Sequence, residues 1–595
     1  MNKTFDSIEK LLLPKGCFFT ETQKQVLIAD GSFNVIAGPG SGKTTVLTAK
    51  FANLLMKRKE TEKGVCLITH TNVAVEEVKS SLKKLGIISV DYPNFIGTIH
   101  EFFNYFFSIR AFNKLNTKKS IRILDDDDYK DKLEPIFRRK NPGYSPDYNI
   151  PNIYKQKARL KVDDKYNVFF KNEGKPSYNK ILNECLEELF YNGMVTNKQC
   201  LELSYWYISE NIELIKKALE SRFSCILLDE AQDTNALQYS LLEMLTENTK
   251  IKYQKYGDPY QALYSIYENE TSDSWVPNDE IKKGIQLKEI DETTRFGTSI
   301  SNVVKNVCME DYDHFHSLEG ITSFPAHFLT FKSNEDLVAK YNKIIADYEK
   351  KNISFRECDK KDAIVSDKHD NLSNYFPSYT KNKIGTVVES SYKSIYNYLI
   401  NEFSILFERS KSEMKSLLIE DLELAKWMSL LISELNADNI SNSKVEEVVQ
   451  RIVEGIDINV QIFVNKIVEQ VISARLNNCE IKQEECKYYL NTIHGVKGET
   501  HRSTMLILRS TLDYKINGDN KLYKLVKPFL LGKRNFDGYV SSDHQKLISA
   551  LKLAYVALSR AKYLIIIAIP NEDIEENDKQ ELIDNNWVEI EWNYQ

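Results

Sequence analysis

The sequence has little of what marks stapled extracellular domains or membrane proteins. Its 595 residues include only nine cysteines, and none of them forms a C-x-x-C pair. This spacing argues against a disulfide framework, a zinc ribbon and an iron–sulfur cluster. The longest apolar runs, such as residues 564–569, are far below the roughly 18 residues that a membrane helix needs. The first residues lack the apolar core of a signal peptide, so we expect a cytoplasmic protein without a membrane partner.

Glycine, proline and an excess of one charge are also scarce. With 22 Gly and 14 Pro the chain is neither collagen-like nor a low-complexity disordered protein. Its 79 basic and 85 acidic residues give a formal charge of −6, which argues against coating nucleic acid by bulk charge. Local basic tracks are compatible with this balance. The chain instead has a globular composition and enough length for several domains.

Strand and helix patterns alternate along much of the chain. Residues 33–37 and 64–68 are short apolar runs, each followed by a stretch with helical spacing. The alternation resumes at residues 225–229 and again over 488–570. Such alternation predicts parallel sheets flanked by helices, an α/β fold. Two stretches interrupt it, one from 108 to 221 with a modest basic excess and one from about 376 to 486 with a helical pattern.

The strongest local signal is a glycine-rich loop between a predicted strand and a predicted helix, with the sequence A-G-P-G-S-G-K-T over residues 37–44. Closely spaced glycines let backbone N–H groups converge on phosphate oxygens, and the helix N-terminus adds its dipole. We expect Lys43 to reach the β and γ phosphates and Thr44 to ligate Mg²⁺. Ala37 stands where the strict motif has its first glycine. A tight turn without a ligand is the alternative.

A carboxylate pair follows the apolar strand predicted at residues 225–229. A nucleotide site needs one carboxylate on the metal and another that positions or deprotonates the attacking water. Asp229 and Glu230 are the candidates for these two roles. An isolated Asp-Glu pair is usually surface charge, but its place after a buried strand favours the functional interpretation.

Four weaker signals lie further along the chain. The Gln261 amide is a candidate sensor of the γ-phosphate, and the Tyr264 ring a candidate platform for a base. Arg295 and Arg560 are candidate cations for the transition state, because a planar guanidinium can meet two phosphoryl oxygens. Each of them, taken alone, is more often an ordinary turn, surface or salt-bridge residue.

The order of these motifs resembles that of the superfamily 1A DNA helicases of the UvrD, PcrA and Rep type, over nearly the whole chain. The early blocks are similar to the adenine-reading Q motif, the phosphate loop and two motifs of the single-strand track, at 19–23, 37–44, 69–72 and 97–100. The later blocks are similar to D-E-x-Q-D-T-N, G-D-x-x-Q-x-I-Y, T-x-H-x-x-K-G and the arginine-finger motif, at 229–235, 257–264, 492–498 and 554–561.

The resemblance implies two RecA-like P-loop NTPase domains, each a parallel sheet flanked by helices and each with a mainly helical insertion. Domain 1A would comprise residues 1–107 and 222–284, with the accessory subdomain 1B inserted at 108–221. Domain 2A would comprise residues 285–375 and 487–595, with a reduced 2B-like helical insertion at 376–486.

The resemblance also assigns the candidate residues to three sites. The catalytic residues are Lys43, Glu230, Gln261, Arg295 and Arg560. The nucleotide-binding residues are Gln23, Ala37, Gly38, Pro39, Gly40, Ser41, Gly42, Lys43, Thr44, Thr45 and Glu499, with Thr44 and Asp229 on Mg²⁺. The DNA-binding residues are Thr71, Asn72, Thr98, His100, Tyr264 and His494, although the two histidines have a core role as their alternative.

Several positions depart from the family pattern. Thr45 and Thr294 replace the Arg and Tyr that sandwich the adenine, so base recognition should rest on Gln23 unless Phe296 fills the gap. Ile266 begins the stretch in which the family has Trp-Arg-Gly, a base-stacking platform. Glu499 directly follows Gly498, whereas the family reads Leu-Glu-Phe there, so the ribose contact should shift by one residue.

Three functions follow as hypotheses. The first is an ATP- and Mg²⁺-dependent DNA helicase or translocase that moves 3′ to 5′ on single-stranded or tailed duplex DNA. The second is an ATPase subunit that senses DNA termini or nucleotides and regulates a separate nuclease, with little processive unwinding. The short insertion and the K-G-E-T-H variant favour this second hypothesis, since they resemble, more loosely, the helicase-like subunits of Gabija-type antiphage defence systems. The third is a structural scaffold, which the presence of Lys43, Glu230 and Arg560 argues against.

Overall fold

The computed structural model divides the chain into two compact units. The larger unit comprises residues 1–125, 132–376 and 488–595, and the smaller unit comprises 126–131 and 377–487. The structure describes residues 2–590 with gaps at 60–61, 117, 142–157, 173–175, 264–274, 283, 311, 313, 377–378, 380–390, 408–413, 415–416, 419–420, 438–439, 455–457, 482–487, 509–510, 517–518 and 535–540.

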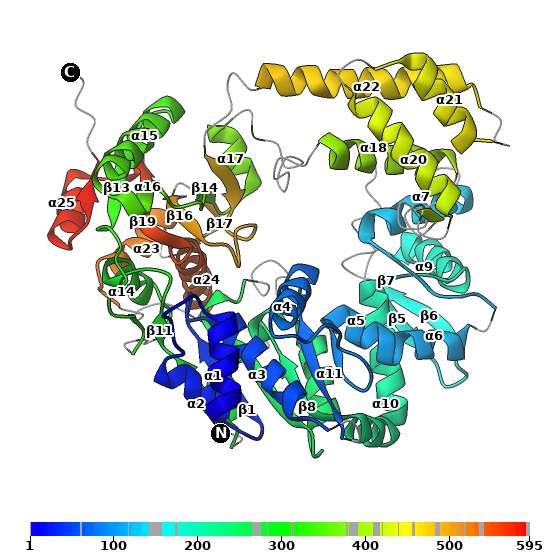
Figure 1. Ribbon diagram of the computed structural model, residues 1–595, viewed down its shortest axis with the longest axis horizontal. Helices are drawn as coiled ribbons and strands as arrows, with labels where there is room; N and C mark the ends of the chain where they lie inside the picture. The colour runs from blue at the N-terminus through cyan, green and yellow to red at the C-terminus, as the bar shows by residue number, and fades with distance from the viewer. Residues whose placement is uncertain are drawn as a thin grey trace. The chain divides into compact units, whose positions relative to one another are not determined.

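The first sheet of the larger unit has six strands in the order β10-β1-β9-β8-β2-β3. Figure 1 labels two of them, β1 and β8. All neighbouring strands run parallel. The strands are β1 (Phe33–Ala37), β2 (Gly64–Thr69), β3 (Phe95–Thr98), β8 (Phe223–Leu228), β9 (Lys252–Gly257) and β10 (Gln286–Ile290).

Helices cover both faces of this sheet, and because side chains alternate between the two faces, the central strands β2 and β8 are mostly apolar along their whole length. Leu67 and Leu227 enter one hydrophobic cluster, whereas their neighbours Ile68 and Leu228 enter another. The first cluster includes residues of α1 (Asn2–Leu12), α2 (Glu21–Ile28), α3 (Lys43–Lys57) and α4 (Asn72–Lys84). The second includes residues of α5 (Ile99–Phe103), α10 (Asn197–Arg222) and α11 (Ala236–Thr246).

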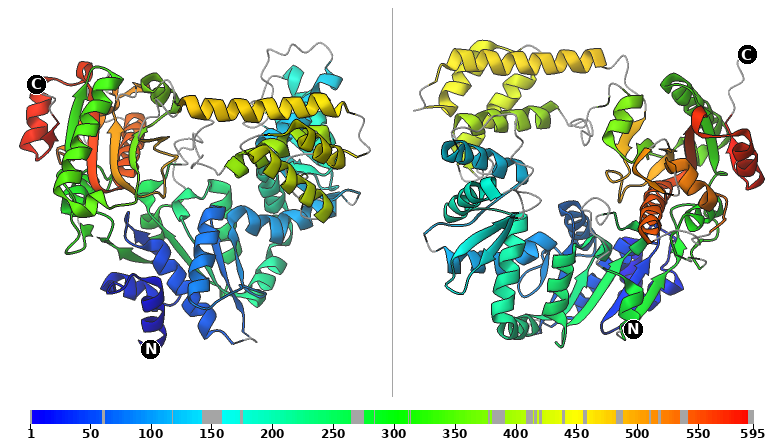
Figure 2. Two further views of the ribbon diagram at one scale, coloured as in Figure 1. Left: turned by 45° about the horizontal axis from the view of Figure 1, so that its top comes forward. Right: turned by 180° about the vertical axis from the view of Figure 1, so that it is seen from behind.

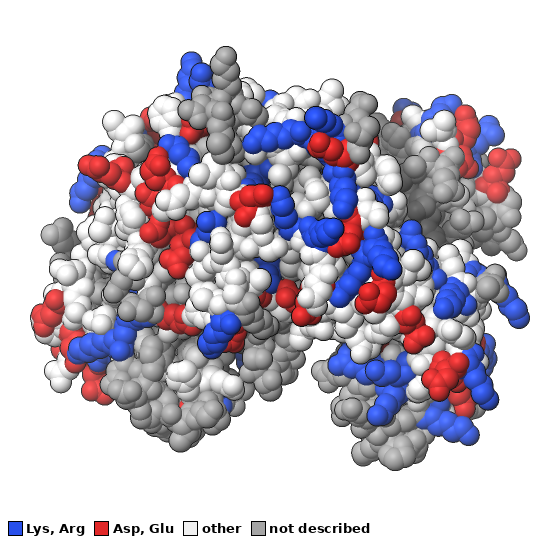
Figure 3. All heavy atoms as spheres, turned by 90° about the horizontal axis from the view of Figure 1, so that it is seen from below, with Lys and Arg blue, Asp and Glu red and all other residues white. Residues whose placement is uncertain are grey.

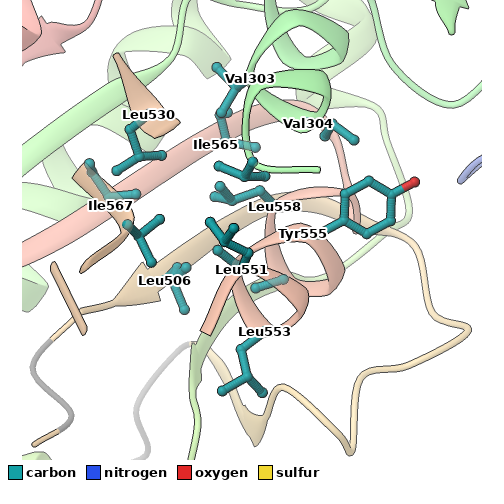
Figure 4. Close-up of a cluster of buried hydrophobic side chains, with 14 of the residues drawn as sticks. Val303, Val304, Leu506, Leu530, Leu551, Leu553, Tyr555, Leu558, Ile565 and Ile567 are labelled. Atoms are coloured by element: carbon teal, nitrogen blue, oxygen red, sulfur yellow. The ribbon is translucent and has the colours of Figure 1, made fainter. Parts of the chain in front are cut away.

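The second sheet also has six strands, all parallel, in the order β15-β14-β16-β19-β13-β20. The strands are β13 (His327–Phe331), β14 (Asp362–Ser366), β15 (Tyr489–Thr492), β16 (His501–Ile507), β19 (Ala561–Pro570) and β20 (Val588–Glu589). On one face, residues of α14 (Thr298–Asn306), α23 (Leu522–Leu530) and α24 (Ser541–Leu558) pack on β16 and β19, as Figure 4 shows for Val303, Leu551 and Ile565. Helices α15 (Asn334–Lys351) and α17 (His369–Tyr375) contact strands of the same sheet.

The segment between β3 and β8 contains short strands as well as helices. Its helices are α6 (Ile109–Leu115), α7 (Asp126–Lys140) and α9 (Pro176–Tyr191), which precede α10. Strands β4 (Arg122–Leu124) and β7 (Met194–Thr196) form a parallel pair. Strands β5 (Ala158–Val162) and β6 (Val168–Asn172) form an antiparallel hairpin. The insertion was expected to be mainly helical, and these short strands were not predicted.

The smaller unit is helical. Its longer helices are α18 (Ser391–Leu406), α20 (Leu422–Asn436), α21 (Asn442–Ile452) and α22 (Val460–Ile481), and they share one hydrophobic cluster. In α21, one of the helices drawn in yellow in Figure 2, the side chains of Val445, Val448, Val449 and Ile452 are buried on one face, in agreement with the helical pattern predicted for residues 376–486.

The prediction of an α/β fold with parallel sheets flanked by helices is confirmed. The first sheet continues to Ile290, beyond the boundary predicted at residue 284, because β10 pairs with β1. The division into six segments stays a prediction. Figure 3 shows basic and acidic side chains interspersed on one face, as expected for a chain with a formal charge of −6. Among the described residues, no helix combines the length and the apolar character that crossing a membrane requires.

Candidate nucleotide site and nucleic-acid track

The glycine-rich loop connects the carboxyl end of β1 to the first residue of α3. Gly40 and Gly42 have φ values of +76° and +75°, in the left-handed region that favours glycine. A Cβ on Gly40 would lie 2.4 Å from the Cβ of Arg295, so the loop backbone is closely covered at this point. Ala37 is the last residue of β1 and pairs with Ile290, an extended position at which alanine replaces glycine without strain.

Lys43 faces both carboxylates that follow β8. Its Nζ donates to Asp229 Oδ1 at 2.5 Å and lies 2.8 Å from Glu230 Oε1. Burial lowers the pKa of Lys43, but the two carboxylates outweigh burial and raise it above its usual value. Burial raises the pKa of Asp229, whose side chain is almost fully buried. The three side chains therefore form a compact ion cluster at the ends of β1 and β8.

The backbone of Glu230 has a strained conformation, which orients its side chain. Its φ is +50°, uncommon for a residue with a side chain. The Gln232 amide donates to Glu230 Oε2 at 2.6 Å. Burial raises the pKa of Glu230, but Lys43 and Lys497 outweigh it and lower the pKa to about 2. The carboxylate is therefore ionised at neutral pH and can accept a hydrogen bond from a water molecule.

The loop has the polar groups that a magnesium nucleotide requires. The Ser41 hydroxyl is buried and has no hydrogen-bond partner among the described residues, so a phosphate oxygen would satisfy it. Thr44 in the first turn of α3 and Asp229 are oxygen donors of the kind that Mg²⁺ prefers. The described residues include no cluster of three or more His, Cys, Asp or Glu that would hold a metal alone. Mg²⁺ would accordingly share its coordination with phosphate oxygens.

Gln261 links the first sheet to α24. It ends the short helix η3 (Pro259–Gln261) after β9, and its Nε2 donates to Asp258 Oδ2 at 2.7 Å. The hydroxyl of Tyr555 donates to the same Oδ2 at 3.1 Å. Arg560 Nη2 donates to Gln261 Oε1 at 2.9 Å. Burial raises the pKa of Asp258 to about 6, although the donors around it lower the pKa in part.

Two arginines lie near the Asp258 and Gln261 side chains. Arg295 follows β10, and Arg560 directly precedes β19. Arg560 is 2% exposed, and its Nε donates to the carbonyl of Val556 at 2.9 Å. Arg295 Nη1 donates to the carbonyl of Ser559 at 2.9 Å. Burial lowers the pKa of both guanidinium groups, and Arg560 lowers that of Arg295 further, to about 9. Neither arginine forms an ion pair with a carboxylate in the described part of the chain.

Lys497, which follows β15 of the second sheet, connects the two sheets. It was not among the predicted site residues. Its Nζ donates to the Asp233 carboxylate and, at 2.7 Å, to the carbonyl of Gln261. Burial raises the pKa of Asp233, and Lys497 opposes that rise only in part. The resemblance of residues 492–498 to the T-x-H-x-x-K-G block was a signal for Lys497, but its partners lie more than two hundred residues away in sequence.

Gln23 packs on the phosphate loop. Its Nε2 donates to the carbonyl of Ser41 at 2.8 Å, and its Oε1 accepts from the backbone N–H of Thr20 in the capping box of α2. Lys50 of α3, missed in the sequence, donates to the carbonyl of Leu27 at 3.0 Å at the other end of α2. Lys50 is 3% exposed, and burial lowers its pKa to about 8. The helix that carries Gln23 is thus held to the helix that begins at Lys43.

The positions that replace the family's adenine sandwich have no aromatic ring. Thr45 is partly buried in the first turn of α3, and Thr294 is exposed, with its N–H donating to the carbonyl of Gly40 at 3.0 Å. Phe296 is fully buried in the core of the second sheet, where it packs on Phe315. Its ring faces that core, so the structure does not support the suggestion that Phe296 fills the gap.

Glu499 has two polar partners in the second sheet. Its Oε2 lies 3.1 Å from Nε2 of His501, and its Oε1 accepts from the hydroxyl of Tyr489 at 3.2 Å. Burial raises the pKa of Glu499, but His501 outweighs burial and the net shift is downward. The departure at residues 499–501 therefore creates a paired carboxylate, and its contact with a ribose stays a prediction.

Four of the predicted DNA-binding residues lie at one edge of the first sheet. Thr71 caps α4 and Asn72 is its first residue, and both are exposed. Thr98 is buried and caps α5, in which His100 is exposed. Because β2 and β3 are parallel neighbours, these residues share the edge at which both strands end.

The remaining two predicted contacts lie elsewhere. His494 is exposed and follows β15 of the second sheet. Tyr264 lies outside the described residues. The structure thus brings Lys43, Glu230, Gln261 and Arg560 into one network with Asp229. The DNA contacts stay predictions.

Comparison with known proteins shows what the sequence around the first sheet is similar to. Residues 19–272 match the UvrD/REP helicase N-terminal domain. A probable DNA helicase II homolog of Mycoplasma capricolum is 26% identical over 407 residues, 66% of this chain and 50% of that protein. A probable DNA helicase II homolog of Mycoplasma genitalium is 30% identical over 275 residues, 41% of this chain and 36% of that protein. The ATP-dependent DNA helicase PcrA of Staphylococcus aureus is 24% identical over 253 residues, 41% of this chain and 33% of that protein.

These matches confirm the resemblance that the motifs predicted. The chain spans half or less of the length of the curated relatives it matches. The matched segment, residues 19–272, is similar to the UvrD/REP helicase N-terminal domain, and the relatives carry the names of DNA helicases.

Proposed function

We propose that this chain, with its segment similar to the UvrD/REP helicase N-terminal domain, is an ATP-dependent DNA translocase and helicase that moves 3′ to 5′ on single-stranded DNA. The observation that carries the proposal is the network around Gln261. The Gln261 amide joins Asp258 to the Arg560 guanidinium. Gln232 accepts from the backbone N–H of Asp258 and donates to Glu230, which lies in the ion cluster with Lys43.

The residues of the first sheet would bind the nucleotide and orient the water. Backbone N–H groups of the loop and Lys43 Nζ would meet the phosphates, which requires Lys43 to exchange a carboxylate for a phosphate oxygen. Glu230, ionised and held by Gln232, would accept a hydrogen bond from the attacking water. Mg²⁺, held by Thr44 and Asp229, would neutralise part of the phosphate charge.

The arginines would stabilise charge that spreads over the phosphoryl oxygens in the transition state. Arg560 is buried and Arg295 half-buried, and both are held by neutral acceptors, so they are oriented before a nucleotide enters. Gln261 contacts Arg560 through its side chain and Lys497 through its carbonyl. A shift of the second sheet therefore changes contacts at the nucleotide, which supports the coupling of hydrolysis to domain movement.

The DNA strand would lie along the edge that carries Thr71, Asn72, Thr98 and His100 and continue to His494. Because these residues belong to two sheets, relative movement of the sheets would alternate grip and release along the strand. The 3′ to 5′ direction rests on the resemblance to UvrD-type helicases.

The test is ATP hydrolysis and strand separation measured together with the purified chain. The reactions contain no DNA, single-stranded DNA, a duplex with a 3′ overhang or a duplex with a 5′ overhang. The proposal predicts that single strands stimulate hydrolysis and that only the 3′-tailed duplex separates. Separation of the 5′-tailed duplex instead would contradict 3′ to 5′ movement. ATP hydrolysis at the same rate with and without DNA would contradict ATP-driven translocation.

The nuclease-regulating ATPase stays a prediction, and the same experiment distinguishes it. Such a subunit would hydrolyse ATP, or bind it, without separating either tailed duplex. Its paired Glu499 and His501, at the departure from the family pattern, are then the first positions to change when a partner nuclease is assayed.

A further inference from the structure

The first glycine of the phosphate loop lies against two aromatic side chains from the core of the second sheet. A Cβ on Gly38 would be 2.4 Å from Phe315 Cε2 and 2.8 Å from the hydroxyl oxygen of Tyr312. The two rings stack on each other, with centroids 5.0 Å apart and planes 12° from parallel. Phe315 is fully buried, and Tyr312 is 5% exposed. Only glycine therefore fits at residue 38 without displacing a buried ring, and the Tyr312 hydroxyl lies beside the loop backbone.

The Tyr312 hydroxyl is buried and has no hydrogen-bond partner among the described residues. Buried hydroxyl groups nearly always have a partner, because an unpaired one has lost its hydrogen bonds to water without replacement. Burial raises the pKa of Tyr312, and Asp258 raises it further, so the hydroxyl keeps its proton at neutral pH. It is therefore a potential donor beside the phosphate loop.

The packing around Tyr312 fixes the direction of its hydroxyl. Its ring centroid lies 5.1 Å from that of Tyr260 in η3, and Tyr260 packs edge-on to Tyr555 of α24. The Tyr555 hydroxyl already donates to Asp258. The backbone N–H of Phe315 donates to the carbonyl of Tyr312 at 3.0 Å. Because ring and backbone are both held, a partner for the Tyr312 hydroxyl has to approach it, and the loop backbone lies directly beside it.

The loop contains an acceptor that a bound nucleotide would release. The backbone N–H of Ser41 donates to the carbonyl of Gly38 at 3.2 Å. In glycine-rich loops before a helix, such N–H groups bind phosphate oxygens, and Ser41 lies two residues before α3. A phosphate that takes the N–H of Ser41 leaves the Gly38 carbonyl without this donor. The Tyr312 hydroxyl lies beside the same glycine.

We propose that Tyr312 is a positioning residue for the bound nucleotide, whose hydroxyl donates to the Gly38 carbonyl when the Ser41 N–H turns to a phosphate. Donors and acceptors balance in this exchange, because the N–H passes to a phosphate oxygen and the carbonyl passes to the hydroxyl. The exchange also pairs a buried hydroxyl, so it favours the loop conformation that binds phosphate. The inference rests on the proposed function, since it names a further residue of the same nucleotide site.

The test compares Tyr312→Phe with a matched control, Tyr523→Phe, in the full chain. Tyr523 of α23 is fully buried in the same core, and its hydroxyl also lacks a partner among the described residues. Burial and the carboxylates of Asp578 and Glu581 raise the pKa of Tyr523, so it lies on the side of the core that faces α25 (Glu576–Asp584). Each variant thus removes one unpaired buried hydroxyl, and only Tyr312→Phe removes one beside the loop.

Nucleotide binding is measured with Mg²⁺ and without DNA. Titration with a fluorescent nonhydrolysable ATP analogue gives its Kd, and thermal unfolding with and without the analogue gives the shift in Tm. We expect the Kd of Tyr312→Phe to rise about five- to tenfold, the effect of about one hydrogen bond, and its Tm shift to be smaller than that of the wild type. Tyr523→Phe should keep the wild-type Kd and Tm shift.

Two further readouts separate positioning from a structural role. Without the analogue, both variants should unfold at or above the wild-type Tm, because each loses an unpaired buried polar group. In steady-state hydrolysis, KM for ATP should rise in Tyr312→Phe while kcat stays within about twofold, since the contact forms on binding and persists in the transition state.

The outcomes distinguish this inference from the proposed function. An unchanged Kd in Tyr312→Phe, or an equal rise in Tyr312→Phe and Tyr523→Phe, would overturn the role of Tyr312 and leave the phosphate loop as assigned. If the wild-type chain did not bind the analogue, both the nucleotide site and this inference would fail. Hydrolysis that DNA does not stimulate would contradict the motor alone, because the binding comparison is made without DNA.

Discussion

The charged residues around the candidate nucleotide site fall into two groups, which we call the first side (Lys43, Asp229 and Glu230) and the second side (Arg295 and Arg560). The two sides differ in how the positive charges are compensated. On the first side, Lys43 lies between Asp229 and Glu230 and its charge is neutralised within the cluster. On the second side, Arg295 and Arg560 are held by carbonyl, amide and hydroxyl oxygens. A buried cation with only neutral partners keeps most of its desolvation cost, as the lowered pKa of both arginines indicates.

This difference predicts that nucleotide binding and ATP turnover respond differently to substitutions on the two sides. An incoming phosphate must compete with two carboxylates for Lys43, whereas it would relieve the uncompensated charge of the arginines. Substitutions on the first side should therefore affect both nucleotide binding and turnover. Substitutions on the second side should affect turnover alone.

The largest effect is expected for Lys43→Ala. The substitution removes the ammonium that meets the phosphates and leaves Asp229 and Glu230 as adjacent carboxylates without a counter-charge. ATP turnover should fall below detection, while binding of single-stranded DNA stays near that of the wild type. Turnover assays and anisotropy measure the two quantities. Wild-type turnover in this variant would show that the loop is not a phosphate site.

The next largest effect is expected for Arg560→Ala. Turnover should fall roughly a thousandfold, because the guanidinium stabilises charge mainly in the transition state. The Kd for a nonhydrolysable ATP analogue should stay within a few-fold of the wild type, unlike that of Lys43→Ala. Arg560→Lys serves as the control, since it keeps the charge without the planar fork. If Lys43→Ala and Arg560→Ala weakened binding of the ATP analogue equally, the two sides would not differ in their contribution to nucleotide binding.

A pH dependence should follow from Asp258, which anchors Gln261 between the two sides. Burial raises its pKa from the usual 3.8 to about 6. The native state therefore holds this proton more tightly than the unfolded chain, so the contribution of Asp258 to stability is present below pH 3.8 and is lost as pH rises through about 6. Protonation also weakens the acceptor for Gln261 and Tyr555.

We thus expect ATP turnover to fall as pH is lowered through about 6, without unfolding caused by this group. Glu230, with a pKa of about 2, stays ionised over this range. Steady-state rates between pH 5 and 8, with thermal unfolding in parallel, measure the effect. Asp258→Asn should turn over more slowly at pH 8 and show a flatter profile. A profile that matches the wild type would assign the titration to another group.

A smaller effect is expected for Lys50→Met, which acts on the first side only. The substitution removes the contacts to the carbonyls of Leu27 and Val26 and loosens the helix that carries Gln23. KM for ATP should rise by up to about tenfold with kcat nearly unchanged, which is the pattern of lost ground-state binding. Lys50→Arg should restore most of the loss. An equal fall in kcat would indicate that α2 contributes to the chemical step.

The smallest effect concerns the base. Thr45 and Thr294 have no ring to stack, and Phe296 faces the core, so we expect recognition of adenine to rest on Gln23. We expect KM values for ATP and GTP that differ by less than about tenfold, since one amide supplies only a few hydrogen bonds. Competition assays measure this ratio. A strong preference for ATP would show that another side chain contacts the base.

Local sequence patterns predicted the elements of the first sheet closely. The apolar run at 33–37 is β1, and the helix expected after the run at 64–68 is α4 (Asn72–Lys84). Hydrophobic periodicity extends over only a few residues, so it can be recognised in the sequence directly. The glycine-rich loop and the carboxylate pair could be located for the same reason, because each occupies consecutive positions after a strand, and their roles in binding and hydrolysis stay predictions.

The contacts between distant segments could not be predicted in this way. Lys497 meets Asp233, and Tyr555 meets Asp258, only because the fold brings the two sheets together. The hairpin of β5 and β6 was missed although its two strands alternate apolar and basic residues. Its strands are short and lie beside long helices in a segment of mixed pattern, where a period of two over five residues is a weak signal.

The stretch that leaves the first sheet touches the loop on its way to the second. After β10, the Thr293 hydroxyl donates to the carbonyl of Pro39 at 2.8 Å, and Thr294 contacts Gly40. Any rotation of the second sheet about this stretch moves atoms that lie directly on the loop. If the proposed function is right, the segment that connects the two sheets also contacts the nucleotide-binding loop, so nucleotide release and movement along a DNA strand should occur together.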